Sequence, residues 1–410
     1  MFSPDKYSVL YKTDVDLIID DTVLNVATSD IVSIAYICNY DTMTYPIIRV
    51  RLYSDLSIIQ ELCDKPDLIH VKINMDANVY RLSQNNDSPV PVSKATSFSI
   101  YLKGYIENKN IPTSVMDQYK DGTKTKNDLN EEIKYPIEIF LYDDEMIHKT
   151  KDSVQSIYKD TSLKPIIESM VSAVQKNPIH IDPLDNQEKY HQVLIPGMNF
   201  VDAMAYIERY YGIYKKGTQV FMDVDGSYIS SIDTSMVTST INPVYVSSSY
   251  NNSDLIGLRK DTSNNSYKMF VLFNNVSVLT ETDIEKTING SYVSDINVKN
   301  GQLNVTDLDK KLKDDELISV PKILHSYQNQ FVSDMMAASI NERITRIDMT
   351  GTGFDVFSLK NNSRYNFVFE SPIRGFDINR LYRASFATHV FSNLDTDLFI
   401  AQSSFTMCTN

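Results

Sequence analysis

The sequence has no tryptophan, only three cysteines, and no apolar run of the length that a membrane-spanning helix requires. It also lacks the basic start and apolar middle of a signal peptide. Cys38, Cys63 and Cys408 follow no spacing pattern, so we do not expect a disulfide framework. These absences predict a protein that is made in a reducing cytosol and has no membrane span.

Positive charge is in short supply. Lys and Arg number 39 against 53 Asp and Glu, which gives a formal net charge of −14. A protein that binds nucleic acid broadly needs cations to neutralise phosphates, so this balance argues against a general nucleic-acid binder. The net charge does not exclude a local basic patch. Basic and aromatic residues do mix in LKNNSRYNF and RLYRASF, but ordinary strand alternation explains both segments.

Motifs for phosphate binding, covalent catalysis and paired metal ligands are missing as well. There is no P-loop, no GxGxxG after a strand, no GxSxG, no CxxC and no HExxH. The histidines are scattered, although His180 and His191 bracket a loop and would meet across a hairpin with Asp182 or Asp185. We predict no catalytic residues, no cofactor and no metal, and hence a protein that is not an enzyme.

Two acidic groups offer alternative chemistry. The run Asp143–Glu145 would supply the carboxylate pair of a glycoside hydrolase, although a solvated turn after a strand is the simpler interpretation. Asp223 and Asp225 resemble the beginning of a calcium-binding EF-hand loop. The glutamate at the twelfth position of that loop is missing and strands are expected on both sides, so a β-turn is favoured.

What the chain has in abundance is length and tyrosine. At 410 residues it is too long for one simple core, and two to four domains are expected. Hydrophobic residues make up 42%, and aromatic burial rests on 26 Tyr and 17 Phe. Tyrosine suits strands and wet protein interfaces, because an apolar ring with a polar tip can face both environments.

Strands are expected to dominate residues 1–150. Apolar and polar residues alternate there with a period of two in the segments 49–52, 70–75, 98–102 and 137–141. This alternation is typical of an antiparallel sheet or barrel with one buried and one polar face. A short helix over 56–62, capped by Ser54, is expected to close one end. The polar segments 83–94 and 107–134 interrupt the strands, and we expect the longer one to contact neighbouring chains.

The stretch His191–Ser230 is the most informative part of the chain. After a strand, Asn199 is placed to cap the beginning of a helix, and Asp202 stands where a carboxylate faces unpaired amides. Gly212 follows the last turn as a stop signal. These signals frame a helix of about three turns.

One apolar stripe recurs at helical spacing in this segment, formed by Phe200, Met204, Ile207 and Tyr211. The stripe is expected to be buried, and Asp202, Glu208 and Arg209 to be exposed. Beyond the helix, short strands joined by hairpin turns are expected at 213–214, 220–222 and 228–229, with Asp223 closing the middle one.

The remaining segments complete the predicted architecture. A second helix follows Ser162, strands return from Ile241, and a third helix near Gln328–Asn341 links strand blocks. The predicted fold class is α+β, mostly β, with two antiparallel β-barrel-like domains flanking a small helix-containing α/β middle domain. The predicted ranges are 1–150 for the first barrel, 151–240 for the middle domain and 241–410 for the second barrel.

Three segments together resemble a known family. IPGMNFVDAMAYIERYYGIYKKGTQVFMDVDGSYI (195–229), YKDTSLKPIIESMVSAV (158–174) and INRLYRASFATHVFSNLDTDLFIAQSSFTM (378–407) follow the order of elements in hub proteins of contractile phage tails and in type VI secretion spike proteins. The matching positions in the first of them are Asn199–Phe200, Tyr211–Ile213 and Phe221–Asp223. The strands over 241–325 match nothing in that family, and the C-terminal needle of the secretion spikes is absent.

The resemblance implies a structural virion protein, a baseplate hub with two similar barrels in each chain. Three chains would form a pseudo-six-fold ring, a symmetry adaptor between the six-fold tail tube and the three-fold spike. The implied partners are the tail tube protein, the central spike protein and other baseplate proteins, after synthesis in the host cytoplasm. DNA would only pass through the lumen, since three chains at −14 each carry −42 and acidic walls would repel phosphates.

Two alternatives remain at this point. A tail-associated hydrolase of cell wall or polysaccharide would need two carboxyl groups about 5–10 Å apart in a cleft, and Asp143–Glu145 is the local candidate. A receptor-binding tail fibre would also be rich in tyrosine and strands. Fibres usually show repeats or elongated low-complexity stems, and none is evident in this sequence.

Overall fold

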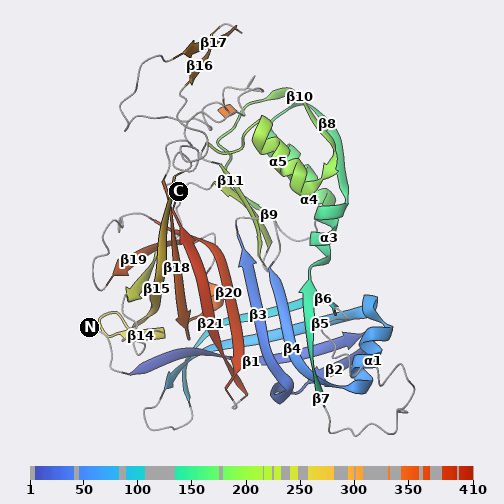
Figure 1. Ribbon diagram of the computed structural model, residues 1–410, viewed down its shortest axis with the longest axis vertical. Coiled ribbons are helices and arrows are strands. Elements are labelled where there is room, and N and C mark those ends of the chain that lie inside the picture. The colour runs from blue at the N-terminus through green and yellow to red at the C-terminus, as the bar shows by residue number, and fades with distance from the viewer. Residues whose placement is uncertain are drawn as a thin grey trace.

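The computed structural model shows a chain dominated by strands (Figure 1). The described residues are 5–40, 46–82, 89–106, 134–174, 179–215, 217–223, 226–231, 241–247, 257–280, 294–299, 302–307, 331–332, 343–359, 363–369, 381–394 and 397–409. The polar segment 107–134 and the helix expected near 328–341 fall almost wholly outside them. The expected fold class, α+β and mostly β, is confirmed.

Eight strands form a first closed barrel. In their order around the barrel they are β1 (Lys6–Ile19), β5 (Ile69–Leu82), β6 (Val90–Tyr105), β7 (Lys134–Tyr142), β4 (Ile47–Asp55), β3 (Ile31–Asn39), β20 (Arg383–Asn393) and β21 (Leu398–Cys408). Every neighbouring pair is antiparallel, and the barrel closes where Leu10, Tyr11 and Lys12 pair with Ile400, Phe399 and Leu398. Strands from both ends of the chain therefore build this barrel.

A second closed barrel uses β1 and β21 again. It adds β14 (Gly257–Asp261), β15 (Ser266–Thr280) and β18 (Arg343–Thr352). β1 meets β14 at Tyr7 and Leu258, and β18 pairs with β21 over Thr352–Arg346 and Gln402–Cys408. β13 (Ile241–Ser247) and β19 (Arg364–Phe369) extend the sheet beyond β15 in parallel, an exception to the expected antiparallel pairing.

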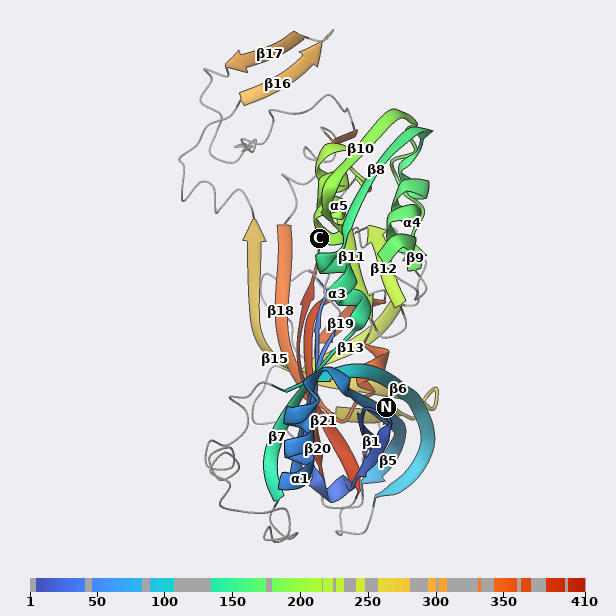
Figure 2. The same cartoon turned by 90° about the vertical axis from the view of Figure 1, so that its right-hand side faces the viewer.

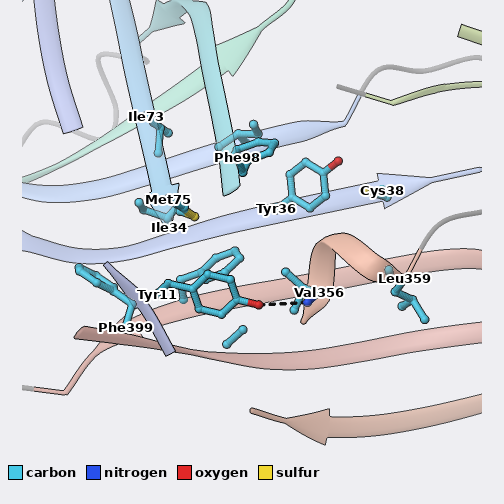
Figure 3. Packing of buried hydrophobic residues seen from close by; sticks show 14 of the residues in the cluster. Tyr11, Ile34, Tyr36, Cys38, Ile73, Met75, Phe98, Val356, Leu359 and Phe399 are labelled. Atoms are coloured by element: carbon cyan, nitrogen blue, oxygen red, sulfur yellow. Dashed lines mark hydrogen bonds between the residues drawn. The ribbon is translucent and has the colours of Figure 1, made fainter. Parts of the chain in front are cut away.

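The barrels are filled by the alternating residues that the sequence predicts. Val50, Leu52, Val71 and Ile73 are buried, whereas Arg49 and Arg51 between them are exposed. Tyr11 lies at the centre of this core, where its hydroxyl accepts from the Val356 amide at 3.0 Å and donates to the Phe354 carbonyl at 3.1 Å (Figure 3). Val356 begins the short 3₁₀ helix η7 (Val356–Ser358).

Phe357, the next residue of η7, inserts its ring into the first barrel. It stacks on Phe98 with ring centroids 4.3 Å apart and meets Tyr11, Tyr36 and Phe391 at about 6 Å. These four aromatic residues belong to four different strands. A segment from the second half of the chain thus plugs a barrel whose strands come mainly from the first half.

The helix that closes one end, α1 (Leu56–Asp64), buries Leu56, Ile59 and Leu62 as expected. The predicted cap is wrong. Ser54 is buried within β4, opposite Tyr135 of β7, and the helix begins after Asp55, whose side chain makes no capping hydrogen bond. Strand pairing therefore continues one residue beyond the point where the sequence suggests a cap.

A helical unit with its own hydrophobic core lies beside the barrels (Figures 1 and 2). Its elements are α3 (Asp144–Lys151), β8 (Ser153–Thr161), α4 (Leu163–Val174), β9 (Ile179–Ile181), β10 (Tyr190–Asn199), α5 (Phe200–Tyr210), β11 (Thr218–Asp223) and β12 (Gly226–Ser231). β8 pairs with β10, and β9, β12 and β11 form a three-stranded sheet. The expected helix after Ser162 is confirmed as α4, with Leu163, Ile166, Met170 and Val174 buried.

Smaller elements complete the fold. β2 (Thr22–Val26) pairs with the end of β1, and the 3₁₀ helix η1 (Thr28–Asp30) follows it. A second 3₁₀ helix, η2 (Pro66–Leu68), precedes β5, and β16 (Ser294–Lys299) pairs with β17 (Gln302–Asp307). In the described part of the chain, no helix has the length and apolar character to cross a membrane. The ranges 1–150, 151–240 and 241–410 stay a prediction, with strands of the first and last ranges sharing one sheet.

Candidate functional site

The beginning of α5 is held as the sequence predicts. Asn199 is the N-cap residue, with its side-chain oxygen accepting from the Asp202 amide at 2.8 Å and its side-chain nitrogen donating to the Asp202 carboxylate at 2.9 Å. The first interaction satisfies a backbone amide that the first turn of a helix leaves unpaired, and the second holds the two side chains together. Asn199 thereby fixes the point at which β10 turns into α5.

The predicted apolar stripe of α5 is largely confirmed. Phe200, Met204 and Ile207 are buried in the core of the helical unit. Tyr211 differs, because it follows the last turn and is only partly buried. Its ring meets that of Tyr190 edge-on, with centroids 4.9 Å apart. The stripe therefore ends one turn earlier than the spacing suggests.

The end of α5 is closed by two residues, one expected and one not. Gly212 adopts a φ of 68°, and its amide donates to the carbonyls of Ile207 and Glu208, both at 3.1 Å. Asn186, which no motif marked, is 1% exposed and donates to the carbonyls of Tyr211 at 2.8 Å and Gly212 at 2.7 Å. A buried amide thus satisfies carbonyls that the end of a helix leaves open.

Glu208 corrects an expectation of exposure. Its carboxylate accepts from the Ile213 amide at 3.1 Å, the Thr218 amide at 2.8 Å and the Thr218 hydroxyl at 2.6 Å. Burial raises the pKa of Glu208, and these hydrogen bonds offset part of the rise. The residue joins α5 to β11. Ile213 and Tyr214, expected as a strand, lie in the turn between them and are buried.

The three-stranded sheet separates the two hydrophobic cores. Val220 and Ile229 point into the core of the helical unit, whereas Phe221 belongs to the core of the barrels, with Tyr228 packed against it. The rings of Phe221 and Tyr228 stack at 4.8 Å, and Phe221 meets Tyr40 of the first barrel edge-on at 5.6 Å. This aromatic layer is where the helical unit docks on the barrels.

One hydrogen bond reinforces the docking: Gln219 of β11 donates to the Tyr40 carbonyl at 3.3 Å. Within the helical unit, the ammonium group of Lys149, on α3, lies 3.1 Å from the Ser227 hydroxyl of β12. Lys149 is 2% exposed. Asp223 is the last residue of β11, where its backbone pairs with Gly226 of β12, so the expected hairpin is confirmed.

The structure does not bring His180 and His191 together. His180 lies near Asp182, where burial raises the pKa of the carboxyl group and the charges of Arg364 and His180 offset part of the rise. His180 stacks on Tyr228 at 4.8 Å, whereas the exposed His191 contacts the Asp160 carboxylate at 2.7 Å on the neighbouring strand β8. The two histidines have different neighbours because His180 is on β9 and His191 is on β10, which belong to separate sheets. Among the described residues, no three His, Cys, Asp or Glu side chains gather into a metal-binding group.

The acidic run Asp143–Glu145 leads into a helix rather than a turn, since α3 begins at Asp144. The side chains of Asp144 and Glu145 fall outside the described residues. The carboxylate pair of the hydrolase alternative therefore stays a hypothesis.

Two closed barrels joined through β1 and β21, with a helical unit docked on an aromatic layer, define a double-barrel β protein. The chain belongs to the family of the bacteriophage PBS1 gene 109 protein, whose family model matches residues 7–396. No curated protein matches the chain.

Several solved structures are similar to this chain at low identity. The tail protein from Neisseria meningitidis MC58 has a TM-score of 0.48 and 11% identity, with 98% of this chain and 97% of that chain covered. The 43 kDa tail protein of prophage MuSo2 from Shewanella oneidensis has a TM-score of 0.46 and 11% identity, with 96% and 97% covered.

The E. coli c3393 protein, a component of the type VI secretion system, has a TM-score of 0.41 and 6% identity, with 92% of this chain and 73% of that chain covered. Phage tail proteins and a type VI secretion protein are thus among the similar chains.

Proposed function

We propose that the protein is the hub of a phage tail baseplate, in which three copies form a ring between the tail tube and the central spike. The observation that carries this proposal is the closure of two barrels within one chain. Because β1 and β21 belong to both, backbone hydrogen bonds run from one barrel into the other without a linker. Three copies then supply six barrels, and a three-fold assembly can present six barrel units to a six-fold tube.

Membership of a bacteriophage protein family supports a place in the virion, in the tail baseplate, after synthesis in the host cytoplasm. The tail tube protein, the central spike protein and other baseplate proteins are the proposed partners. The segment 107–134 is proposed to contact neighbouring chains. The cap at Asn199, the stop at Gly212 and the strand end at Asp223 serve the fold of the helical unit and carry no catalytic role.

Passage of DNA through the ring is the second part of the proposal. Three chains at −14 each carry −42, and acidic walls repel phosphates, so the genome would slide through the lumen without binding. A homotrimer of this kind is a permanent assembly. Its interfaces should therefore bury about 2,000 Å² or more and be partly apolar.

The test is the mass and symmetry of the purified protein, alone and after coexpression with the tube and spike proteins of the same phage. Light scattering gives the mass, and class averages of electron micrographs give the outline. We expect a trimer with a pseudo-six-fold outline. A chain that stays monomeric in the presence of both partners would overturn the proposal, and cleavage of cell walls by the pure protein would favour the hydrolase instead.

A further inference from the structure

The outer surface of the first barrel carries aromatic and basic side chains that none of the contacts above uses. We call this surface the Arg49 face, and six side chains on β4, β6 and β7 define it: Arg49, Arg51, Tyr53, Tyr101, Tyr105 and Phe140. Each alternates along its strand with a buried residue, so all six point away from the barrel core. Tyr53, Tyr101 and Tyr105 are 44%, 57% and 51% exposed, respectively.

Strand register orders these side chains. Tyr105 pairs with Phe140 and Phe140 pairs with Arg49, so the three stand in one row across three strands. The guanidinium of Arg49 lies over the Phe140 ring, 5.2 Å from its centroid, and His70 stacks on Tyr101 at 5.1 Å. Side chains held in place in this way lose little conformational entropy on binding. Arginine and tyrosine in such positions are typical of binding hot spots.

The charge of this surface opposes that of the rest of the chain. Over β4, β6 and β7, five cationic residues contribute +5 and two acidic residues contribute −2, which gives +3. They are Arg49, Arg51, Lys94, Lys103 and Lys134, and Asp55 and Glu138. With a total of −14, the remainder of the chain carries −17. Another copy of the chain therefore offers mainly acidic surface to the Arg49 face, and the two surfaces attract.

The position of the face determines the kind of contact. Counted around the first barrel from β1, β7 and β4 are the fourth and fifth of eight strands, opposite the seam at which β1 meets β21 and the second barrel begins. Figure 1 shows β4 and β7 on the side away from β14, β15 and β19. A contact made here extends the line of barrels outward from one chain to the next.

Two copies cannot join symmetrically through this face, because Arg49 and Arg51 of one copy would then oppose those of the other. The partner surface must be a different one, which makes the contact head-to-tail, and such contacts close into a ring when the rotation from copy to copy divides a full turn. We propose that the Arg49 face binds the acidic surface of the next copy of this chain in the trimeric ring. This inference rests on the proposed function and names the surface that builds its ring.

The test compares two charge reversals of equal size. Arg49→Glu with Arg51→Glu changes the face, and Lys159→Glu with Lys189→Glu makes the same change on exposed positions of the helical unit. Circular dichroism and melting temperature check that both variants fold. Analytical ultracentrifugation of the full chain then measures the trimer dissociation constant at ~0.1 M and ~1 M salt, where the Debye length falls from ~10 Å to ~3 Å.

We expect the trimer dissociation constant of the face variant to be at least about 30-fold higher than that of wild type, as for the loss of one hot-spot residue. The control variant should remain trimeric. High salt should weaken the wild-type trimer. A face variant that assembles as tightly as wild type would overturn the inference and leave the hub proposal standing. A wild-type chain that forms no trimer with its tail partners present would overturn both.

Duplex DNA is a second ligand that a basic and aromatic surface could attract, and it gives a distinct outcome. A fluorescent 30-base-pair duplex, titrated with both variants at ~0.1 M salt, measures it. Loss of DNA binding in the face variant, with the trimer unchanged, would assign the face to DNA and overturn the contact proposed here.

Discussion

Val220 and Phe221 are neighbours in β11, yet their side chains lie in different hydrophobic cores. Val220 contacts the helical unit, and Phe221 contacts the barrels through Tyr40. Successive residues of a strand point to opposite faces of the sheet, so one short hairpin can contribute side chains to the cores of both the helical unit and the barrels. The helical unit is therefore attached through a packed layer and not only through its chain connections.

Substitutions of these two residues should each destabilise a different hydrophobic core. Phe221→Ala removes a ring from the barrel core and should lower the free energy of unfolding by about 3–5 kcal/mol, the range for buried Phe-to-Ala changes. Hydrogen exchange should rise in β3 and β12. Val220→Ala is the matched control and should raise exchange in α4 and α5 instead. Identical exchange patterns in the two variants would contradict the two-core arrangement.

The cap of α5 gives a second prediction. Asn199→Ala should cost about 1 kcal/mol of stability, because the Asp202 amide loses its acceptor. Asn199→Asp keeps an acceptor at the same place and should stay within a few tenths of the wild-type value. Urea unfolding measures both. Equal stability of the alanine and aspartate variants would show that the cap contributes nothing.

Asn186 gives a third prediction, at the other end of the helix. Asn186→Asp replaces two buried donors by acceptors that face the carbonyls of Tyr211 and Gly212, so a loss of about 3 kcal/mol is expected. Hydrogen exchange at the end of α5 should rise as well. The exposed amide of Gln192 is the control, and Gln192→Glu should change stability by about 0.5 kcal/mol or less. A small effect at Asn186 would remove its role as a helix stop.

His389 gives a prediction for pH. It is 1% exposed, its ring lies 2.8 Å from the Ser403 hydroxyl, and burial lowers its pKa to about 3. The unfolded chain, with a histidine pKa of about 6.5, binds a proton that the folded protein does not. The stability that this group contributes is therefore complete above about pH 6.5 and is lost as pH falls toward 3.

The expected loss from this group between pH 6.5 and 5 is about 2 kcal/mol, at about 1.4 kcal/mol for each pH unit. Urea unfolding of wild type and His389→Gln at both pH values measures it, since glutamine can keep a hydrogen bond to Ser403 without titrating. The stability difference between the two proteins should shrink or reverse on acidification. A difference that does not change with pH would mean that His389 does not titrate as described.

Local signals in the sequence predicted local structure well. Asn199 and Gly212 marked the ends of α5, and alternation in β4, β5, β6 and β7 identified the buried face of each strand. Such features depend on residues a few positions apart, where spacing alone fixes which side chains share a face.

Contacts between distant segments were not predictable from spacing. The Tyr11 hydroxyl accepts a hydrogen bond from a backbone amide 345 residues further along the chain. Likewise, β20 and β21 complete a barrel whose first strand is β1, at the other end of the chain. Asn186 was missed for the same reason, because the carbonyls that it binds lie 25 and 26 residues further along the chain. Glu208 was missed although its partners are only 5 and 10 residues away, because they face it only after the chain turns at the end of α5. A polar residue in a loop looks alike in sequence whether it is exposed or buried as a cap.

The most direct test of the hub proposal is a cryo-electron-microscopy reconstruction of the tail tip of the bacteriophage that encodes this chain. We predict three copies in one ring between tube and spike, with six barrels around an open lumen and the Arg49 face of each copy against its neighbour. Density that places the chain outside the junction of tube and spike, or in a number other than three, would contradict the account.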